Sequence, residues 1–356
     1  MRTGIANLPL HYGRAPAWLF KRMRLLARQI TLAIVTEYGP QEMLLRLSDP
    51  FWFQAFGCVL GFDWHSSGLT TTVCGALKEG LKDLQKELGL CVTGGKGRVS
   101  RKTPDEIRQY GEALGVDPAP LVYASRMSAK VDNAALQDGY QLYHHNLVFT
   151  QTGQWAVIQQ GMNEGNRYAR RYHWLGSHVT DFVCEPHSAV CCDHKAEVLN
   201  MTAKESDGSR DASAALSRED PDKVLKELNK SHAQLTLPSA HPVNTSMIHP
   251  DRLKKVLLST YDQQPQDFET LLGIKGVGPK TIRSLSLLSE IVYGVKASFR
   301  DPVRFSFAHG GKDGHPYPVD RKNYDLSIDF LRKAIDQSKI GRTEKVQALK
   351  RLGSLF

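Results

Sequence analysis

Apolar residues near the N-terminus recur every three or four positions, as they do along one face of an α-helix. The repeat consists of Leu19, Met23, Leu26, Ile30 and Ile34. We therefore expect residues 16–60 to be helical. A second apolar row predicts a helix over residues 69–88. A capping box that begins at Thr103, with a proline at the first helical position, predicts another helix that ends near residue 113.

The pattern changes to short β-branched and aromatic runs between residues 119 and 163. Residues 121–125 have the composition of a strand, and residues 140–149 and 154–162 predict two strands joined by a tight turn, that is, a β-hairpin. Residues 203–240 are polar and contain few large apolar groups, which is typical of a linker. Helical spacing resumes near residue 250 and ends the chain.

These elements predict the fold class, a mixed α/β (α+β) protein. We expect a domain over residues 1–202 with a central β-hairpin or small sheet, a polar linker over 203–240, and an all-α domain over 241–356. A chain of 356 residues is long enough for two or three domains that each bury a core.

The chain is basic overall, with a formal net charge of +9. The excess of lysine and arginine lies in residues 1–110 and 251–356, whereas residues 111–199 are slightly acidic. Such an excess favours polyanions as partners, nucleic acid before anionic membranes, because cations attract phosphates over long distances and release their counterions. A merely basic soluble protein is the alternative.

The apolar stretches are too short for a membrane span, which needs about 20 residues. The longest uncharged apolar stretch covers residues 50–62 only. The first twenty residues also lack the apolar core of a secretory signal. We therefore expect no membrane partner and a cytoplasmic protein whose six cysteines are free thiols. Assembly into a homo-oligomer is left open.

Two segments combine features of nucleic-acid contacts. Residues 93–102 hold three glycines, which let a backbone approach a ligand closely, and the cations Lys96, Arg98 and Arg101, which predicts a phosphate-binding loop. The loop lacks the spacing of a nucleoside triphosphate site, and a flexible turn is the alternative. Residues 167–174 interleave aromatic residues with Arg170 and Arg171, a mixture that suits single-stranded nucleic acid.

The most specific local pattern lies at residues 271–285, where two apolar helical segments flank two glycines. The glycines expose backbone N–H groups at the start of the second segment, where they can hold one phosphate, and two lysines add charge. The predicted DNA contacts here are Lys275, Gly276, Val277, Gly278, Lys280 and Thr281. The segment resembles the helix-hairpin-helix motif of DNA polymerases, ligases, glycosylases and nucleases, which binds the DNA backbone without reading sequence. An ordinary helix connection is the alternative.

Four further segments carry a wider resemblance. They are TGIANLPLHYG at 3–13, FDWHSSG at 62–68, DGYQLYHH at 138–145 and YARRYHW at 168–174. Together with the hairpin they resemble the prokaryotic family called domain of unknown function 763, over nearly the whole chain. By analogy with other proteins that carry this hairpin, the resemblance implies DNA processing or repair, nucleolytic activity included. It implies no catalytic set.

Polar residues are densest over 130–174, where short strands and turns are expected. A metal-dependent phosphodiesterase needs carboxylates to hold the metal and a cation to stabilise charge on the phosphate. The predicted ligands of Mg²⁺ or Mn²⁺ are Asp138, Asp132, Asp63 and His65; the predicted catalytic residues are Asp138, Asp132, Lys130, Gln160 and His144. Asp138 with Gln160 imitates restriction-type nucleases, although the second strand lacks their lysine. In the alternative, the two aspartates cap turns and the histidines are structural.

A compact group of soft ligands follows, with Cys184, His187, Cys191, Cys192 and His194 within eleven residues. Structural zinc usually takes two ligand pairs separated by a longer loop, so free thiols are favoured over zinc at Cys184, His187, Cys191 and His194. The sequence as a whole predicts a DNA-binding protein that cuts single-stranded, duplex or branched DNA with a divalent metal and without sequence specificity. The alternatives are a non-catalytic DNA-binding scaffold and an RNA-processing factor.

Overall fold

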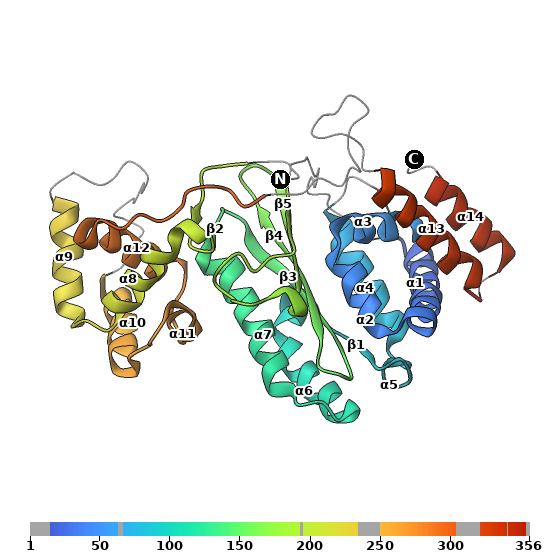
Figure 1. The fold of residues 1–356 in the computed structure, drawn as a ribbon, viewed down its shortest axis with the longest axis horizontal. Coiled ribbons are helices and arrows are strands. Elements are labelled where there is room, and N and C mark those ends of the chain that lie inside the picture. Colours follow the sequence, from blue (N-terminus) through green and yellow to red (C-terminus); the bar gives the residue numbers. More distant parts are fainter. Residues whose placement is uncertain are drawn as a thin grey trace.

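The computed structural model describes residues 15–62, 67–192, 195–233, 250–303, 321–339 and 341–353. It is elongated, with a central sheet and a helical group at either end (Figure 1). The fold is a mixed α/β fold, as predicted. None of the helices in the described ranges is long and apolar enough to cross a membrane.

The N-terminal helical group confirms the apolar repeat. Its helices are α1 (Ala17–Tyr38), α2 (Pro40–Ser48), α3 (Pro50–Val59), α4 (Gly68–Leu81) and the short α5 (Gln85–Leu88). Two prolines at first helical positions divide what periodicity alone predicted as one helical region. Asp49 caps α3, because its Oδ1 accepts a hydrogen bond from the backbone N–H of Phe51 at 2.8 Å.

The central sheet is antiparallel throughout, in the order β1-β3-β4-β5-β6. Its strands are β1 (Leu90–Lys96), β3 (Gln141–Thr150), β4 (Trp155–Asn163), β5 (Tyr168–Leu175) and β6 (Ala189–Cys191). The predicted hairpin is the β3–β4 pair. A separate small sheet pairs β2 (Leu136–Gln137) with β7 (Leu199–Asn200). The predicted central hairpin is therefore the middle of a five-stranded sheet.

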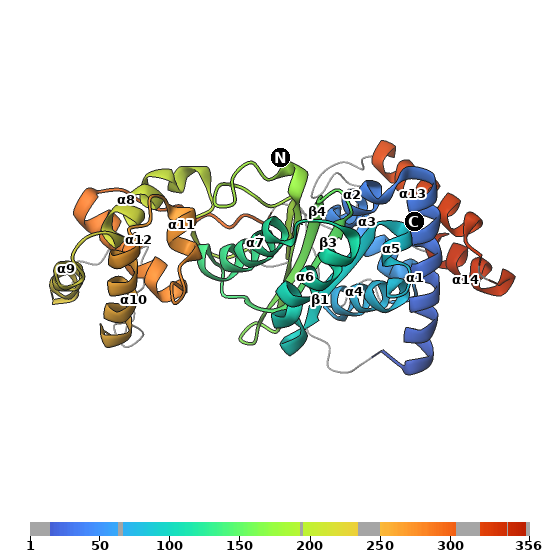
Figure 2. The same ribbon diagram turned by 90° about the horizontal axis from the view of Figure 1, so that it is seen from below.

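Both faces of the sheet are covered, and each carries its own set of polar residues. Side chains alternate between the faces, so the aligned residues His145, Gln159 and Tyr172 share one face, while Gln160 and Arg171 lie on the other. Figure 2 shows α7 on one side of the strands and α1 on the other. Two separate apolar cores form on these two sides.

The structure corrects the strand predicted at residues 121–125. This segment lies inside helix α7 (Pro118–Lys130), which follows α6 (Thr103–Leu114). The carboxylate of Asp117 caps α7 by accepting from the N–H of Ala119 at 2.9 Å, and Pro118 stands at the first helical position. A short apolar run fits a buried helix as well as a strand, and here the start signal decides for the helix.

The structure also corrects the linker predicted at 203–240 within its described part. That part forms α8 (Asp207–Ser217) and α9 (Pro221–Ala233). The small residues of α8 let it pack closely on α12, with the hydroxyls of Ser213 and Ser289 3.4 Å apart. The same low content of large apolar groups that predicted a linker therefore serves close helix packing.

The remaining helices fall into two places. Those of the first group are α10 (Pro250–Gln263), α11 (Phe268–Gly273) and α12 (Pro279–Tyr293); those of the second are α13 (Arg321–Gln337) and α14 (Arg342–Gly353). The second group packs on the N-terminal helices at the other end of the molecule (Figure 1). There Arg351 donates from Nε to the carbonyl of Val59 at 2.7 Å. Residues predicted as one all-α domain are thus divided between both ends.

Overpacking the contact between α8 and α12 tests its role in stability. Replacing the buried Ser213 by leucine should lower the free energy of unfolding by about 1–3 kcal/mol, because the added carbons have no space at this interface. Urea denaturation measures the change. Asp211→Leu, at an exposed position of the same helix, is the control and should leave stability nearly unchanged; equal stability of both variants would contradict a close contact.

Candidate functional site

The turn between α11 and α12 presents backbone N–H groups to solvent. Gly276 adopts a φ of +96°, which favours glycine, and Gly278 stands at the N-cap of α12, where no side chain caps the helix. Within the described residues, the N–H groups of Gly276 and Gly278 have no hydrogen-bond partner. The start of a 15-residue helix therefore carries donors that are open to an acceptor from outside.

Apolar side chains hold the turn on the side that faces the protein interior. Ile274 and Val277 are buried, whereas Lys275, Gly276 and Lys280 are exposed. Of the predicted DNA contacts in this segment, the side chains of Val277 and Thr281 are thus in the interior and support the turn. The two lysines and the glycine backbone lie on the surface.

The predicted catalytic residue Lys130 is an anchor of this turn. Its Nζ donates to the carbonyl of Val277 at 2.6 Å and to that of Ile274 at 3.3 Å, and burial lowers the pKa of its ammonium group. A few residues further on, Gln137 donates from Nε2 to the carbonyl of Pro279 at 2.8 Å. The end of α7 and the residues after it therefore hold the turn in place.

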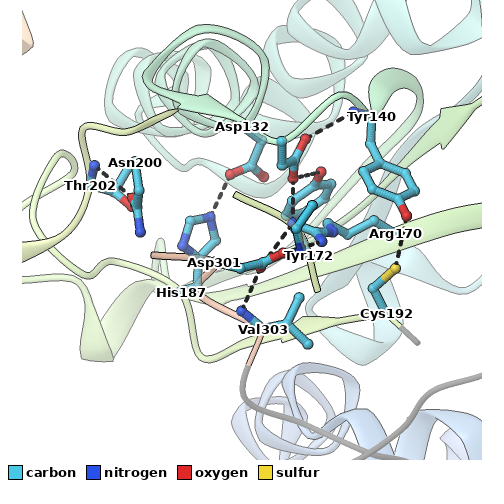
Figure 3. Close-up of polar contacts among 12 residues, drawn as sticks. Asp132, Tyr140, Arg170, Tyr172, His187, Cys192, Asn200, Thr202, Asp301 and Val303 are labelled. Carbon is cyan, nitrogen blue, oxygen red and sulfur yellow. Dashed lines mark hydrogen bonds and ion pairs between the residues drawn. The ribbon is translucent and has the colours of Figure 1, made fainter. Parts of the chain in front are cut away.

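Asp132 lies two residues beyond Lys130 and is fully buried. Its Oδ2 accepts from Gln159 Nε2 at 2.6 Å and from Trp174 Nε1 at 3.0 Å. Its Oδ1 is 2.5 Å from Nε2 of His187 (Figure 3). All three partners come from other parts of the chain, and together they occupy both carboxylate oxygens.

Asp138 belongs to a neighbouring network around Arg170. Its Oδ2 accepts from Arg170 Nη1 at 3.0 Å and from the Tyr172 hydroxyl at 2.7 Å, and its Oδ1 accepts from the N–H of Tyr140 at 3.0 Å. Arg170 also donates from Nη2 to Asp301 at 2.8 Å. Burial opposes the charge of the guanidinium, but the two carboxylates outweigh it and hold the pKa of Arg170 well above its usual value. Arg170, predicted as a DNA contact, is instead a buried ion-pair partner.

The opposite face of the sheet holds three other predicted residues. Gln160 accepts from the hydroxyl of Thr70 and donates to the carbonyl of Ser67 at 2.8 Å. His144 is buried, and its ring nitrogens have no partner among the described residues; burial lowers its pKa to about 3. Arg171 donates to Gln54 Oε1 at 3.1 Å inside the core, so it too is away from the surface. Gln160 and His144 are therefore not brought together with Asp132 and Asp138.

A metal centre does not assemble from the described part of the predicted ligand set. Asp63 and His65 lie outside the described residues, and both Asp132 and Asp138 are already bound by three donors each. Within the described ranges, no group of three or more histidine, cysteine, aspartate or glutamate side chains could hold a metal ion. These residues as they stand do not fit Mg²⁺ or Mn²⁺.

The predicted zinc ligands do not form a common site among the described residues either. His194 lies outside the described residues, and His187 is bound to Asp132. Cys191 is buried beside Arg171, and burial raises the pKa of its thiol to about 12, which favours the protonated form that metals do not bind. Cys184 and Cys191 are free thiols.

The glycine-rich loop has a structural reason for part of its sequence. A side chain at Gly94 would come within 2.2 Å of the carbonyl oxygen of His145, so glycine is required where β1 approaches β3. Lys96, Arg98 and Arg101 are exposed. Lys96 lines a groove of about 1150 Å³ together with residues of α4. The loop keeps its cations on the surface, as a phosphate contact requires.

The buried networks around Asp132 and Arg170 together form what we call the polar centre. A cavity of about 600 Å³ lies beside it. His187, Lys195, Asn200, Thr202, Arg300 and Asp301 are among the residues that line it. Asp301 is held there by Arg170 and by the N–H group of Val303 at 3.0 Å (Figure 3). The N–H group of Ala196 also donates to it at 3.0 Å. The wall therefore combines a segment after β6 with one that follows α12.

A family model described as protein of unknown function (DUF763) matches residues 4–319. The chain belongs to the DUF763 family. No curated protein and no solved structure matches it. The comparisons thus bear out the resemblance seen in the sequence and leave the role of each residue to the structure.

This DUF763 protein also uses residues that sequence reasoning missed as site residues. They are Gln159, Tyr172, Trp174, His187 and Asp301. Gln159 stands next to the predicted Gln160, but only one of two adjacent strand residues can face Asp132. The only sequence signal for His187 is its place in the group of cysteines and histidines at 184–194.

Removing the charge of Arg170 tests the buried network in this DUF763 protein. Arg170→Met should lower the free energy of unfolding by about 3–5 kcal/mol, because it leaves the carboxylates of Asp138 and Asp301 buried without their cation. Guanidinium denaturation measures the loss. Arg126→Met, at an exposed position of α7, is the control; a loss for Arg170→Met no larger than for this control would contradict a buried ion pair.

Proposed function

We propose that this protein binds DNA through the sugar–phosphate backbone, in DNA processing or repair. The observation that carries the proposal is the turn between α11 and α12. Its N–H groups at Gly276 and Gly278 have no partner among the described residues, and its Lys275 and Lys280 are exposed. This arrangement resembles a helix-hairpin-helix motif. N–H groups at the start of a helix suit a phosphate oxygen, because both the donors and the helix dipole favour negative charge.

Contacts of this kind are made to phosphate and carry no sequence information, so we propose binding without sequence specificity. The buried side chain of Val277 and the hydrogen bonds from Lys130 hold the turn before any ligand arrives. A donor group that is already in position loses little conformational entropy on binding. The exposed cations of the glycine-rich loop, Lys96, Arg98 and Arg101, would add a second phosphate contact.

Placing a bulky side chain beside the exposed N–H groups of the turn tests DNA binding. Gly278→Leu should weaken binding at least about tenfold, because its side chain would cover the N–H groups and remove a charge-assisted hydrogen bond worth about 1.5–3 kcal/mol. The backbone of Gly278 tolerates a side chain, since the nearest atom to an added Cβ is 3.9 Å away. Fluorescence anisotropy with two unrelated duplexes measures the affinity.

Gly273→Leu is the matched control, because it adds the same side chain at an exposed glycine of α11 and should leave the affinity within about twofold of the wild type. Lys275→Ala and Lys280→Ala should each reduce the slope of log affinity against log salt by about one. Unchanged affinity and unchanged salt slope in all three turn variants would sink the proposed contact.

A second candidate function is hydrolysis of phosphodiester bonds. The observation that favours it is the path of residues 130–138: Lys130 and Gln137 hold the turn, while Asp132 and Asp138 of the same segment reach the polar centre beside the cavity. The same backbone segment thus contacts both the turn that would hold DNA and a group of buried polar side chains. We propose a nuclease of this kind without Mg²⁺ or Mn²⁺ at Asp132 and Asp138, whose carboxylates are already bound by other side chains.

Incubation of the purified chain with single-stranded, duplex and branched DNA, and with RNA, separates the candidates. Each substrate is tested with Mg²⁺, with Mn²⁺ and with EDTA, and products are resolved on denaturing gels. We expect DNA products. Binding without product under every condition would leave the non-catalytic scaffold, and products from RNA alone would indicate an RNA-processing factor.

A further inference from the structure

A chain of hydrogen bonds determines which nitrogens of two histidines carry protons. Gln159 donates from its amide nitrogen to Asp132, so its amide oxygen faces His145 Nδ1, 2.9 Å away. An oxygen without a hydrogen can only accept, so Nδ1 of His145 carries the proton. Burial lowers the pKa of His145, which favours its neutral form. Its Nε2 then accepts from the hydroxyl of Ser125 at 2.8 Å.

The same reasoning extends from Asp132 to His187. Gln159 and Trp174 both donate to the Oδ2 of Asp132, as a carboxylate requires. The 2.5 Å contact between Oδ1 and Nε2 of His187 is then a hydrogen bond that the histidine donates. In the neutral ring, the proton is on Nε2 and the lone pair is on Nδ1. Asp132 therefore orients the ring and selects its tautomer.

The second ring nitrogen of His187, Nδ1, is available to accept a proton. His187 lines the 600 Å³ cavity, and no described residue hydrogen-bonds its Nδ1. Lys195 and Arg300 also line this cavity, together with the carboxylates of Glu185, Glu205 and Asp301. Within the described chain Lys195 has no ion-pair partner, whereas Arg300 lies 3.7 Å from Glu205 and Asp301 is paired with Arg170. A basic nitrogen and the ammonium group of Lys195 thus face one space. A phosphate group bound there would meet this positive charge next to a proton acceptor.

We propose that His187 is a catalytic residue, the general base of a phosphodiester hydrolysis in this cavity, and that Asp132 is its positioning residue. This proposal rests on the proposed DNA binding. Nδ1 of His187 takes a proton from a water molecule while the water oxygen forms a bond to phosphorus. The bond from phosphorus to one sugar oxygen breaks, and that oxygen takes a proton from solvent. The products are a phosphomonoester and a hydroxyl, and His187 returns its proton to water.

Two residues of one backbone segment, Lys130 and Asp132, contact the turn that would hold DNA and the proposed base, respectively. Lys130 binds the turn carbonyls and Asp132, two residues later, binds His187. Lys130 ends α7, and Asp132 lies in the wider π-helical turn Val131–Ala135 that continues it. One continuous helical segment, largely buried, therefore carries both the anchor of the turn and the residue that orients His187.

The activity test compares two histidines. His187→Gln should reduce the rate of DNA cleavage about 10²–10⁴-fold, the usual contribution of a general base, while the affinity for DNA stays within about twofold. His178→Gln, at an exposed position outside the cavity, is the matched control and should cleave like the wild type. Thermal unfolding of each variant checks that it is folded.

The outcomes separate the two proposals. If the wild type binds DNA but never cleaves it, or if His187→Gln cleaves at the wild-type rate, the general-base proposal fails and DNA binding survives. If the wild type binds no DNA, the proposed function fails as well.

A second measurement needs no variant and no turnover. Nitrogen NMR of ¹⁵N-histidine-labelled wild type should assign the Nε2-protonated tautomer to His187, and titration with thymidine 3′,5′-bisphosphate should shift its Nδ1 signal. Asp132→Asn should move the proton to Nδ1, because the amide oxygen must accept from Gln159 and Trp174 and its NH2 group then donates to Nε2 of His187. A proton on Nδ1 in the neutral wild-type ring, or an Nδ1 signal that the bisphosphate leaves unmoved, would overturn the proposal.

Discussion

A buried guanidinium has to be paired, and the pairing of Arg170 organises much of this protein. Arg170 lies on β5, in the interior, with one carboxylate from Asp138 before β3 and another from Asp301 after α12. Leaving either carboxylate unpaired in the interior would cost several kcal/mol, so the three segments have to meet. Their meeting brings the chain that follows α12 back to the sheet. Since Asp301 also binds the N–H groups of Ala196 and Val303, it shapes the cavity wall.

The segment 130–138 then joins the two parts of the molecule that carry the proposed function. Lys130 and Gln137 hold the turn between α11 and α12 by its backbone carbonyls. Asp132 and Asp138 hold His187 and Arg170. A residue that looked catalytic in sequence, Lys130, thus acts as a structural anchor, and its value to function is the placement of the turn. The turn between α11 and α12 and the polar centre therefore belong to one packed unit.

Much of the fold could be predicted because it depends on local periodicity. The apolar repeat of α1, the hairpin of β3 and β4, and the glycines around Val277 all follow from spacing along the chain. Local spacing does not decide the structure where the composition of a segment is ambiguous. The apolar run at 121–125 fits a buried helix as well as a strand, and the serines of α8 resemble a linker until their packing on α12 is known.

The candidate site was predicted in part, for a related reason. Asp132 and Asp138 do lie in a polar centre, but the sequence did not indicate their partners. Gln159 faces Asp132, and the predicted Gln160 faces Thr70 on the opposite side of the sheet. A shift of one residue in a strand reverses the face, and only the register of neighbouring strands decides it.

By itself, the sequence determined the fold class, the membership in the DUF763 family and the position of a glycine turn with exposed lysines. The tertiary structure alone decided the pairing of Asp132 with His187 and of Arg170 with Asp301, which are 55 and 131 residues apart in the chain. The physical reason is that periodicity reports which side of an element is buried. Which two buried polar groups meet depends on how distant elements pack, because each such group takes whatever partner the packing brings within hydrogen-bonding distance.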